Sequence, residues 1–415
     1  MFPTRREFLK TSVAGGGLVT CGLTAPAFLT RTAAAAPAAG KPGARDTILV
    51  VVQMTGGNDG LNTVIPYADD QYAKLRPTLR FRKNQVKKID DHIGLHPSLD
   101  GLAGLLQDHV LGIVQGVGYP NPNQSHFRSM DIWQAASMTE DPAEGWLGRA
   151  LKQRPMPAFH LGGSNETAPL AFAGAPVRVP SIAALDDFQL RTAAASGADR
   201  MAQRRVIEGA AMQKPTQANL LDFVRRTAVN TYASSQRLKE IGKNYQPKVP
   251  YPNSPLANHL KLAAQLISGD LGARIFYVQI DNFDTHANQA TTHANLLSQM
   301  SAAMTAFYKD MASRGHKDRV LMMTFSEFGR RVHENGSQGT DHGTAAPMFL
   351  VGGKVKAGLI GAHPSLTDLA FGNLKHRIDF RQVYAAVLEN WLGVPTKDVL
   401  GGSFRPADIF KQRPA

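Results

Sequence analysis

Acidic, histidine and serine side chains stand next to the short apolar stretches of this 415-residue sequence, where the strands of a sheet would begin or end. Carboxylates mixed with histidines form a ligand set that proteins use for Zn²⁺, Mn²⁺ or Mg²⁺. We therefore predict a cleft that binds a divalent metal, with zinc as one candidate. The candidate ligands are Asp59, Asp284, His286, Glu327 and His342.

Ser125 is the candidate nucleophile, because it is expected at the start of a helix. Backbone N–H groups and the helix dipole favour a bound anion at such a position. A hydroxyl group beside a metal suits the transfer of a phosphoryl or sulfuryl group. Arg330, with Arg331 and Arg128 as further candidates, would hold the anionic oxygens through bidentate hydrogen bonds.

Each of these residues also has a structural interpretation. An Asp or Ser after a strand is commonly a turn former or a helix cap. His286 would then cap its helix, and His342 would pack in a loop. The combination of residues favours the metal site, and a structure with Ser125 and His342 on opposite faces of the sheet would rule out a hydrolase.

Short apolar runs alternate with helical patterns along the chain. The runs 47–54, 110–117, 273–280, 320–325 and 347–351 are typical of buried strands. Helical spacing occupies 97–107, 125–136, 219–241, 255–271, 286–314 and 379–391, and Asp379 and Gln382 form a capping-box pattern at the start of the last. This alternation predicts an α/β fold with a mostly parallel sheet, whose active site lies beyond the carboxyl ends of the strands.

Residues 1–39 have the pattern of a twin-arginine signal peptide. Arg5 and Arg6 precede Phe-Leu-Lys, an apolar stretch rich in Gly and Ala follows, and the alanines at 33–39 offer cleavage sites. The apolar stretch is interrupted and shorter than the ~20 residues of a membrane span. We therefore expect the twin-arginine translocase to export the folded chain to the periplasm or the extracellular space, with no transmembrane segment in the mature chain.

Cysteine usage and charge exclude several classes of function. Cys21 is the only cysteine and lies in the predicted signal peptide, which excludes disulfides, iron–sulfur clusters and a cysteine nucleophile from the mature chain. The formal net charge is +13, with basic residues spread along the chain. No helix-turn-helix or stacking-aromatic motif accompanies them, so we expect an anionic small molecule or polymer as substrate and no nucleic acid.

The stretch from about 175 to 250 differs in composition from the strand-rich segments. It is mostly helical in pattern and polar, with arginine pairs at 204–205 and 225–226. We predict that it is an insertion or cap over one edge of the sheet.

Longer motifs resemble the bacterial domain-of-unknown-function 1501 proteins. They are Gly-Gly-Asn-Asp-Gly-Leu-Asn at 56–62, Gly-Tyr-Pro-Asn-Pro-Asn-Gln-Ser-His-Phe-Arg-Ser-Met-Asp at 118–131, Gly-Trp-Leu-Gly-Arg at 145–149, Asp-Thr-His at 284–286, Ser-Glu-Phe-Gly-Arg at 326–330 and Asp-His-Gly at 341–343. The resemblance covers nearly the whole mature chain, and this family in turn resembles the alkaline phosphatase and sulfatase superfamily. It implies an alkaline-phosphatase-like three-layer α/β/α sandwich over residues 46–415, and a two-metal hydrolase with a Ser, Thr or formylglycine nucleophile.

The superfamily pattern is matched in part. Ser125 falls at the nucleophile position, Asp59 or a neighbour falls near the first metal carboxylate, and His342 resembles the last histidine ligand. Glu327 falls where an Asp-His pair is expected, and Phe328 replaces that histidine. We therefore expect one metal, or a looser pair, in place of a full two-zinc site.

Asp284 and His286 resemble the paired Asp and His ligands, at a closer spacing than alkaline phosphatases use. Together these features predict an exported, metal-dependent hydrolase of phosphate or sulfate esters. The alternative is a non-catalytic protein on the same fold that binds an envelope polymer or assists a partner there. The missing histidine at Phe328 favours that alternative.

Overall fold

Residues 47–163, 166–185, 238 and 240–411 are described by the computed structural model. The predicted signal peptide and residues 186–237 of the predicted insertion lie outside these ranges, so both stay predictions. The larger of two compact units comprises residues 42–181, 246–264 and 273–415 and carries all the candidate site residues. The described part of the smaller unit is 182–185, 238, 240–245 and 265–272. Among the described helices, none is both long and apolar enough to cross a membrane.

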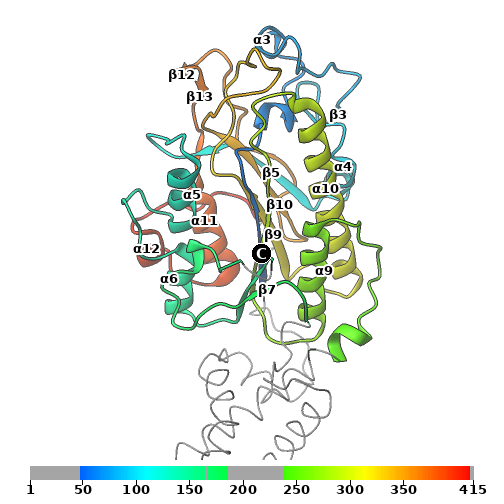
Figure 1. The fold of residues 1–415 in the computed structure, drawn as a ribbon, viewed down its shortest axis with the longest axis vertical. Coiled ribbons are helices and arrows are strands. Elements are labelled where there is room, and N and C mark those ends of the chain that lie inside the picture. Colours follow the sequence, from blue (N-terminus) through cyan, green and yellow to red (C-terminus); the bar gives the residue numbers. More distant parts are fainter. Residues whose placement is uncertain (1–46, 164–165, 186–237, 239, 412–415) are drawn as a thin grey trace, which may run out of the picture. The chain divides into compact units, whose positions relative to one another are not determined.

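A twisted sheet forms the middle of the larger unit (Figure 1). Its strands lie in the order β11, β5, β10, β9, β1, β8, β6, and β14 pairs with β5. The bounds are β1 Ile48–Met54, β5 Leu111–Gly118, β6 Ala158–Leu161, β8 Ile275–Ile280, β9 Val320–Phe325, β10 Ala346–Val351, β11 Gly358–Ile360 and β14 Ile378–Asp379. Of β7 (Ser181–Ile182), Ser181 belongs to the larger unit and Ile182 to the smaller.

Strand β1 lies between β8 and β9 and runs parallel to both. The register places Met54 opposite Ile280 and Gln53 opposite Phe325, so the three strands end at the same level. Strand β10 is antiparallel to β9 and β5. Its first residue therefore lies at the edge where β1, β8 and β9 end, and loops from both kinds of strand meet there.

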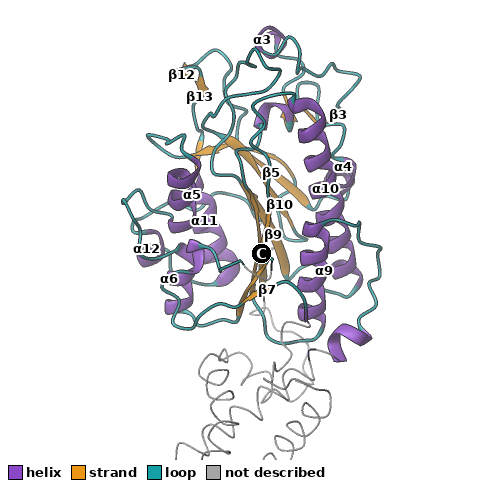
Figure 2. Ribbon diagram, in the orientation of Figure 1, coloured by secondary structure: helices purple, strands orange, loops and turns teal. Residues whose placement is uncertain are grey.

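Helices cover both faces of the sheet, which confirms the predicted three-layer α/β/α arrangement (Figure 2). On one side lie α5 (His126–Ala135), α6 (Trp146–Gln153), α11 (Phe380–Ala386) and α12 (Lys397–Leu400), and on the other lie α4 (Asp100–Gln107) and α10 (Gln289–Ser313). Further helices are α3 (Asp70–Leu75), α9 (Pro255–Ser268), the short 3₁₀ turns η1 (Gly60–Asn62) and η2 (Leu170–Phe172), and the π-helix η4 (Val387–Leu392).

Within the described ranges, two small sheets lie outside the central one. The first has the order β2-β4-β3 and contains β2 (Val64–Ile65), β3 (Lys87–Lys88) and β4 (Gly94–Leu95). The second is a hairpin of β12 (Leu369–Ala370) and β13 (Asn373–Leu374). Figure 1 shows the hairpin, with α3, at the end of the unit toward which β1 runs.

The predicted elements that fall within the described residues are present within a few residues of their expected bounds. All five apolar runs are strands, since they form β1, β5, β8, β9 and β10. The capping box of α11 is also present: Asp379 accepts a hydrogen bond from Arg381 N, and Gln382 Oε1 accepts one from Asp379 N at 3.1 Å. The predicted helix 219–241 falls almost wholly outside the described residues.

Stacked aromatic rings hold α5 against the end of β9. The ring of Trp133 stacks on Phe325 at 5.4 Å and on Phe380 at 4.3 Å between centroids. The Ser129 hydroxyl donates a hydrogen bond to the Glu327 carbonyl. Because Trp133 and Ser129 are buried, these contacts fix the start of α5 relative to the loop after β9.

Two glycines allow the loop after β1 to approach its neighbours. Gly56 and Gly57 have φ of +116° and +78°, a region that favours glycine. A Cβ atom on Gly56 would lie 2.4 Å from Asp284 N, and one on Gly57 would lie 2.4 Å from the Phe328 ring. The Gly-Gly pair therefore brings the loops after β1, β8 and β9 into contact.

Candidate functional site

Five loop segments meet at the carboxyl end of β1, β8 and β9. They follow these three strands or precede α5 and β10. An isolated antiparallel bridge between Arg330 and His342 ties the segment after β9 to the one before β10. The side chains that these segments bring together are His126, Asp284, His286, Glu327, Arg330, Asp341 and His342.

Asp284 lies at the centre of this cluster. Its Oδ1 atom is 2.9 Å from His286 Nε2 and 3.1 Å from His342 Nε2, and its Oδ2 atom is 3.3 Å from His126 Nε2. Three imidazoles from three loops therefore surround one carboxylate. His126, Asp284 and His342 can each offer one ligand atom within 4.8 Å of the others, a spacing that a single ion can bridge.

The orientation of each imidazole is fixed through its other nitrogen. His342 Nδ1 is 2.8 Å from the carbonyl oxygen of Gln124, and His126 Nδ1 is 2.8 Å from Glu327 Oε1. Both partners are acceptors, so both Nδ1 atoms donate. In the neutral imidazoles the lone pairs are then on Nε2 and face Asp284. A donor bond from the far nitrogen to a carbonyl or carboxylate is the usual support of a metal-bound histidine.

His286 adds a third Nε2 atom to the same space. It lies 2.9 Å from His342 Nε2, while its Nδ1 atom lies 3.4 Å from Asp341 Oδ1. Two Nε2 lone pairs at this separation repel each other unless a cation or a proton lies between them. His126 Nε2 is buried and makes no hydrogen bond. The donor set therefore fits one divalent ion held by histidine nitrogens and a carboxylate.

The pKa shifts favour the protonation states in which carboxylates and histidines bind metal ions at neutral pH. Burial raises the pKa of Asp284, but the hydrogen bond from Arg330 and the charge of Arg330 outweigh this effect and hold the pKa at about 2. Burial lowers the pKa of His342. The hydrogen bond to Glu327 raises the pKa of His126. Asp284 is therefore anionic and His342 neutral, whereas a metal ion would compete with a proton at His126.

Glu327, a predicted ligand, is fully buried behind His126. Its Oε1 atom accepts hydrogen bonds from Gly56 N at 2.8 Å and from His126 Nδ1, and its Oε2 atom accepts one from the Ser326 hydroxyl at 3.2 Å. Its carboxylate is thus used to orient His126 and the loop after β1.

Asp59, also a predicted ligand, lies in a separate buried network. Its carboxylate forms a two-pronged ion pair with Arg76, at 2.6 and 3.0 Å, and both side chains are 0% exposed. Gln289 Nε2 donates a third hydrogen bond to it. Burial raises the pKa of Asp59, but the charge of Arg76 overcomes this effect and brings the pKa to about 2. Asp59 is therefore an anion neutralised by Arg76, with no part in the cluster around Asp284.

Arg330, predicted to bind substrate, is 1% exposed, and its guanidinium group donates to protein acceptors. Nε donates to the Gly57 carbonyl at 2.7 Å, Nη1 to the Thr340 carbonyl at 2.8 Å and Nη2 to Asp284 Oδ1 at 2.6 Å. These bonds hold Asp284 in place and join three loops. In this arrangement the group has no exposed face for an anionic substrate.

Ser125 is the N-cap residue of α5 and is exposed, directly before His126. Its side chain makes no capping hydrogen bond, and its N–H donates to Asn123 Oδ1 at 2.8 Å. The hydroxyl is therefore at the positive end of the helix and open to solvent. Ser125 and His342 lie on adjacent segments, since the Gln124 carbonyl accepts from His342.

Phe328 occupies the position where the resemblance suggests a histidine. Its ring lies 4.9 Å from that of His126 and 4.7 Å from that of His342, and it is buried. The aromatic ring packs against two of the imidazoles that surround Asp284 and offers no ligand. Among the described residues, one group of three or more candidate ligands is present, which suits a single ion.

Sequence reasoning missed His126, the residue that links Asp284 to Glu327. It lies in the family-like motif at 118–131, one position after Ser125. Its place at the first helical position, next to the candidate nucleophile Ser125, is the sequence feature that could have indicated a role in the site. The partners Arg76 and Gln124 carried no comparable signal, because an arginine in a helix end and a carbonyl group in a loop have no special pattern.

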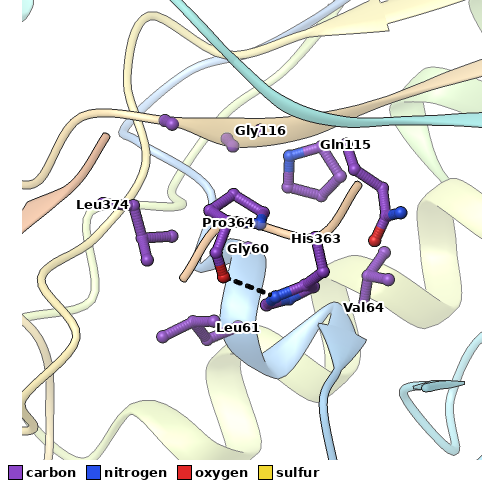
Figure 3. A pocket seen from close by; sticks show the side chains of 11 residues that line it. Gly60, Leu61, Val64, Gln115, Gly116, His363, Pro364 and Leu374 are labelled. Atoms are coloured by element: carbon purple, nitrogen blue, oxygen red, sulfur yellow. Dashed lines mark hydrogen bonds between the residues drawn. The ribbon is translucent and has the colours of Figure 1, made fainter. Parts of the chain in front are cut away.

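A small cavity lies close to these loops but is too small for a substrate. It has a volume of about 20 Å³, and Leu61, Val64 and Leu374 are among the residues that line it. Figure 3 shows these apolar side chains and the contact of the His363 ring with the Pro364 carbonyl, 2.8 Å long. A volume of this size holds a water molecule or so, so the open, solvent-facing cluster at Asp284 remains the candidate site.

Comparisons with known proteins place the chain in a family. The family described as "Protein of unknown function (DUF1501)" matches residues 46–405, as the motifs predicted. No curated protein matches the chain.

Solved structures that are similar at low identity include the following three. The lipoteichoic acid synthase LtaP of Listeria monocytogenes has 10% identity and a TM-score of 0.37, with 90% of this chain and 80% of that chain covered. The sulfatase PsFucS1 of Pseudoalteromonas has 11% identity and a TM-score of 0.39, with 87% and 70% covered. The alkaline phosphatase of the Antarctic bacterium TAB5 has 10% identity and a TM-score of 0.30, with 74% and 92% covered.

Proposed function

The chain belongs to the DUF1501 family, and we propose that it is an exported, metal-dependent hydrolase of phosphate or sulfate esters. One observation carries the proposal: Nε2 atoms of three histidines face one carboxylate, with hydrogen-bond acceptors at the Nδ1 atoms. One imidazole would be enough to neutralise the Asp284 carboxylate in an ordinary ion pair. Three converging imidazoles with an exposed side are typical of a catalytic metal site.

Each residue then has a role that its contacts support. His126, Asp284 and His342 would hold the ion, with His286 as a further ligand, and Glu327 and Arg330 would orient them. The ion would polarise an ester oxygen and lower the pKa of a hydroxyl group or water. Ser125 would supply the hydroxyl nucleophile, and the N-terminus of α5 would stabilise the anionic group of the substrate.

Hydrolysis of 4-nitrophenyl phosphate and 4-nitrophenyl sulfate tests the proposal. The protein is purified without chelator and assayed before and after treatment with EDTA. We expect release of 4-nitrophenol from at least one ester, loss of release with EDTA, and recovery on addition of Zn²⁺ or Mn²⁺. Absence of turnover with both esters at every metal would contradict a hydrolase.

A non-catalytic envelope-binding protein is the second candidate, and two observations favour it. Phe328 packs where a second set of ligands would be needed, and Arg330 has no free face for an anion. Such a protein would bind the ion and a polymer and release no product. The 4-nitrophenyl assays separate the two candidates.

The Glu327→Gln variant is expected to weaken metal binding by roughly 10- to 100-fold, as losses of a partner behind a metal-bound histidine usually do. The amide would still accept one hydrogen bond but would no longer balance the charge of the site. Competition with a fluorescent chelator measures the affinity. The control is Glu389→Gln: that residue is exposed and accepts a hydrogen bond from Thr396, away from the cluster. Equal affinities of the Glu327→Gln variant and the wild type would show that Glu327 does not support a ligand.

Export by the twin-arginine translocase is part of the same proposal and rests on residues 1–39. Replacing Arg5 and Arg6 together by Lys is expected to leave unprocessed precursor in the cytoplasm. Cell fractionation followed by immunoblotting measures the distribution. Normal export of this double variant would show that another route is used.

A further inference from the structure

Two phenylalanine rings stand exposed on segments that are hydrogen-bonded to the candidate site or belong to it. Phe127 is 87% exposed and Phe371 is 98% exposed, while the third large exposed apolar side chain in the described residues, Val177, is 45% exposed. Phe127 directly follows His126 at the start of α5, and Phe371 lies at the tip of the β12–β13 hairpin. Single exposed apolar residues are ordinary on protein surfaces, so the position and backbone of these two are what distinguish them.

Phe371 is displayed by a turn that usually excludes bulky residues. The hairpin pairs Ala370 with Asn373, so Phe371 and Gly372 form a two-residue turn, with φ of +52° and +78°. Positive φ at both positions is the geometry for which Asn-Gly is preferred. A bulky residue with positive φ is a true outlier, and such outliers gather at functional sites. The backbone is therefore strained at a position where the ring makes almost no contact with the rest of the protein.

Hydrogen bonds connect the hairpin to both segments of the site. Gln124 Nε2 donates to Asn373 Oδ1 at 3.3 Å, and the Thr344 hydroxyl donates to the Leu374 carbonyl. Gln124 also accepts from His342 through its carbonyl, and Asn373 Nδ2 donates to the Phe371 carbonyl at 3.3 Å. The two exposed rings are thus attached to the same framework that orients the metal-facing histidines.

We infer that Phe127 and Phe371 form a binding subsite for a sugar ring of the polysaccharide that carries the ester group. This inference rests on the proposed function and names the substrate class of the same site. A pyranose ring has an apolar C–H face that can pack on an aromatic ring, whose face is electron-rich. Its hydroxyl groups suit the amide and hydroxyl side chains of the two segments that carry the rings, which are Asn121, Asn123, Gln124 and Ser125 before Phe127 and Asn373 after Phe371.

The surroundings of the rings do not suit a membrane surface. A lipid-binding surface combines apolar residues with Lys or Arg side chains that are free to reach lipid headgroups. The loop before Phe127 is composed of Asn, Pro, Gln and Ser, and Arg128, which follows Phe127, donates a hydrogen bond to the Met138 carbonyl. On the hairpin, Lys375 is paired with Asp368. The combination of aromatic rings and amides therefore favours a saccharide over a bilayer.

Binding to an array of polysaccharides tests the inference without requiring turnover. The array carries sulfated and phosphorylated polysaccharides and their unesterified parents, and vesicles of phosphatidylglycerol and phosphatidylcholine serve as the lipid probe. The variants are Phe127→Ala and Phe371→Asn, with Val177→Ala as the control. Asn adopts positive φ readily, so Phe371→Asn should unfold at the same temperature as the wild type or a higher one.

We expect the wild type to bind at least one polysaccharide, both Phe variants to bind it at least 10-fold more weakly, and Val177→Ala to bind it unchanged. Unchanged binding by the Phe variants, or no polysaccharide bound by the wild type, would overturn the inference. So would vesicle binding that the same variants lose. If the 4-nitrophenyl esters are not hydrolysed but polysaccharide binding behaves as expected, the proposed hydrolase fails and the subsite stands.

Discussion

The His126→Ala variant is expected to lose metal binding and ester hydrolysis while staying folded. His126 Nε2 faces Asp284 and would be a ligand of the proposed ion, and Nδ1 is oriented by the buried Glu327. Loss of a group that hydrogen-bonds to a metal ligand costs about 10- to 100-fold in metal affinity or activity. Loss of the ligand itself should therefore cost at least about 100-fold in each. Isothermal titration with Zn²⁺ and the 4-nitrophenyl assays measure these two quantities, and circular dichroism reports the fold.

The matched control for this variant is His333→Ala. His333 is exposed and lies between Arg330 and His342 in sequence. Its removal should leave metal affinity and turnover at the wild-type level. A His126→Ala protein that binds metal and turns over ester like the wild type would show that His126 belongs to a hydrogen-bonded pair with Glu327 and to no metal site.

The Asp59→Asn variant is expected to be strongly destabilised, by about 3–5 kcal/mol, because it leaves the buried guanidinium of Arg76 without its counter-charge. Urea unfolding measures the change. Asp408→Asn is the control: its pair with Lys356 is exposed, and such pairs contribute about 0–1 kcal/mol. The double variant Asp59→Asn with Arg76→Met should be more stable than Asp59→Asn alone, since it buries no unpaired charge. If Asp59 were a metal ligand, Asp59→Asn would lose metal with little loss of stability.

The same network makes the protein less stable in acid. The pKa of Asp59 is about 2, below its usual 3.8, so its contribution is full above pH 4 and is lost as the pH falls toward 2. Burial lowers the pKa of His293 to about 4. Between pH 6.5 and 4, His293 is therefore protonated in the unfolded chain but neutral in the folded chain, which lowers the free energy of unfolding as the pH falls. The urea midpoint should therefore fall steadily from pH 7 to pH 4, and a constant midpoint would contradict these shifts.

Strand positions and the fold class could be predicted because buried strands are continuous apolar runs. Val320–Phe325 has the predicted bounds, and the run at 47–54 differs by one residue. The direction of β10 could not be predicted from its composition. That direction matters for His342: a residue that precedes a parallel strand would lie at the far edge of the sheet, and the antiparallel β10 brings it to the same edge as Asp284.

The candidate site was predicted in part, since sequence indicates which residues stand at strand ends but not which partner each one finds. Asp284, His286 and His342 meet as the pattern suggested. Asp59 stands at a strand end as well, but Arg76, 17 positions later, neutralises it. From the sequence, Arg330 resembles a substrate-binding residue. Only the tertiary structure shows that its guanidinium group donates hydrogen bonds to backbone carbonyl groups. Pairing between distant segments decides these roles.

The most direct test of a metal centre at His126, Asp284 and His342 is the metal content of the wild-type protein. Protein purified without chelator is analysed by inductively coupled plasma mass spectrometry, then stripped and titrated in turn with Zn²⁺, Mn²⁺, Mg²⁺ and Ca²⁺. The arrangement of the three histidines around Asp284 predicts one divalent ion per chain, removed by EDTA and restored by titration. A folded protein that binds none of the four ions would contradict the metal centre.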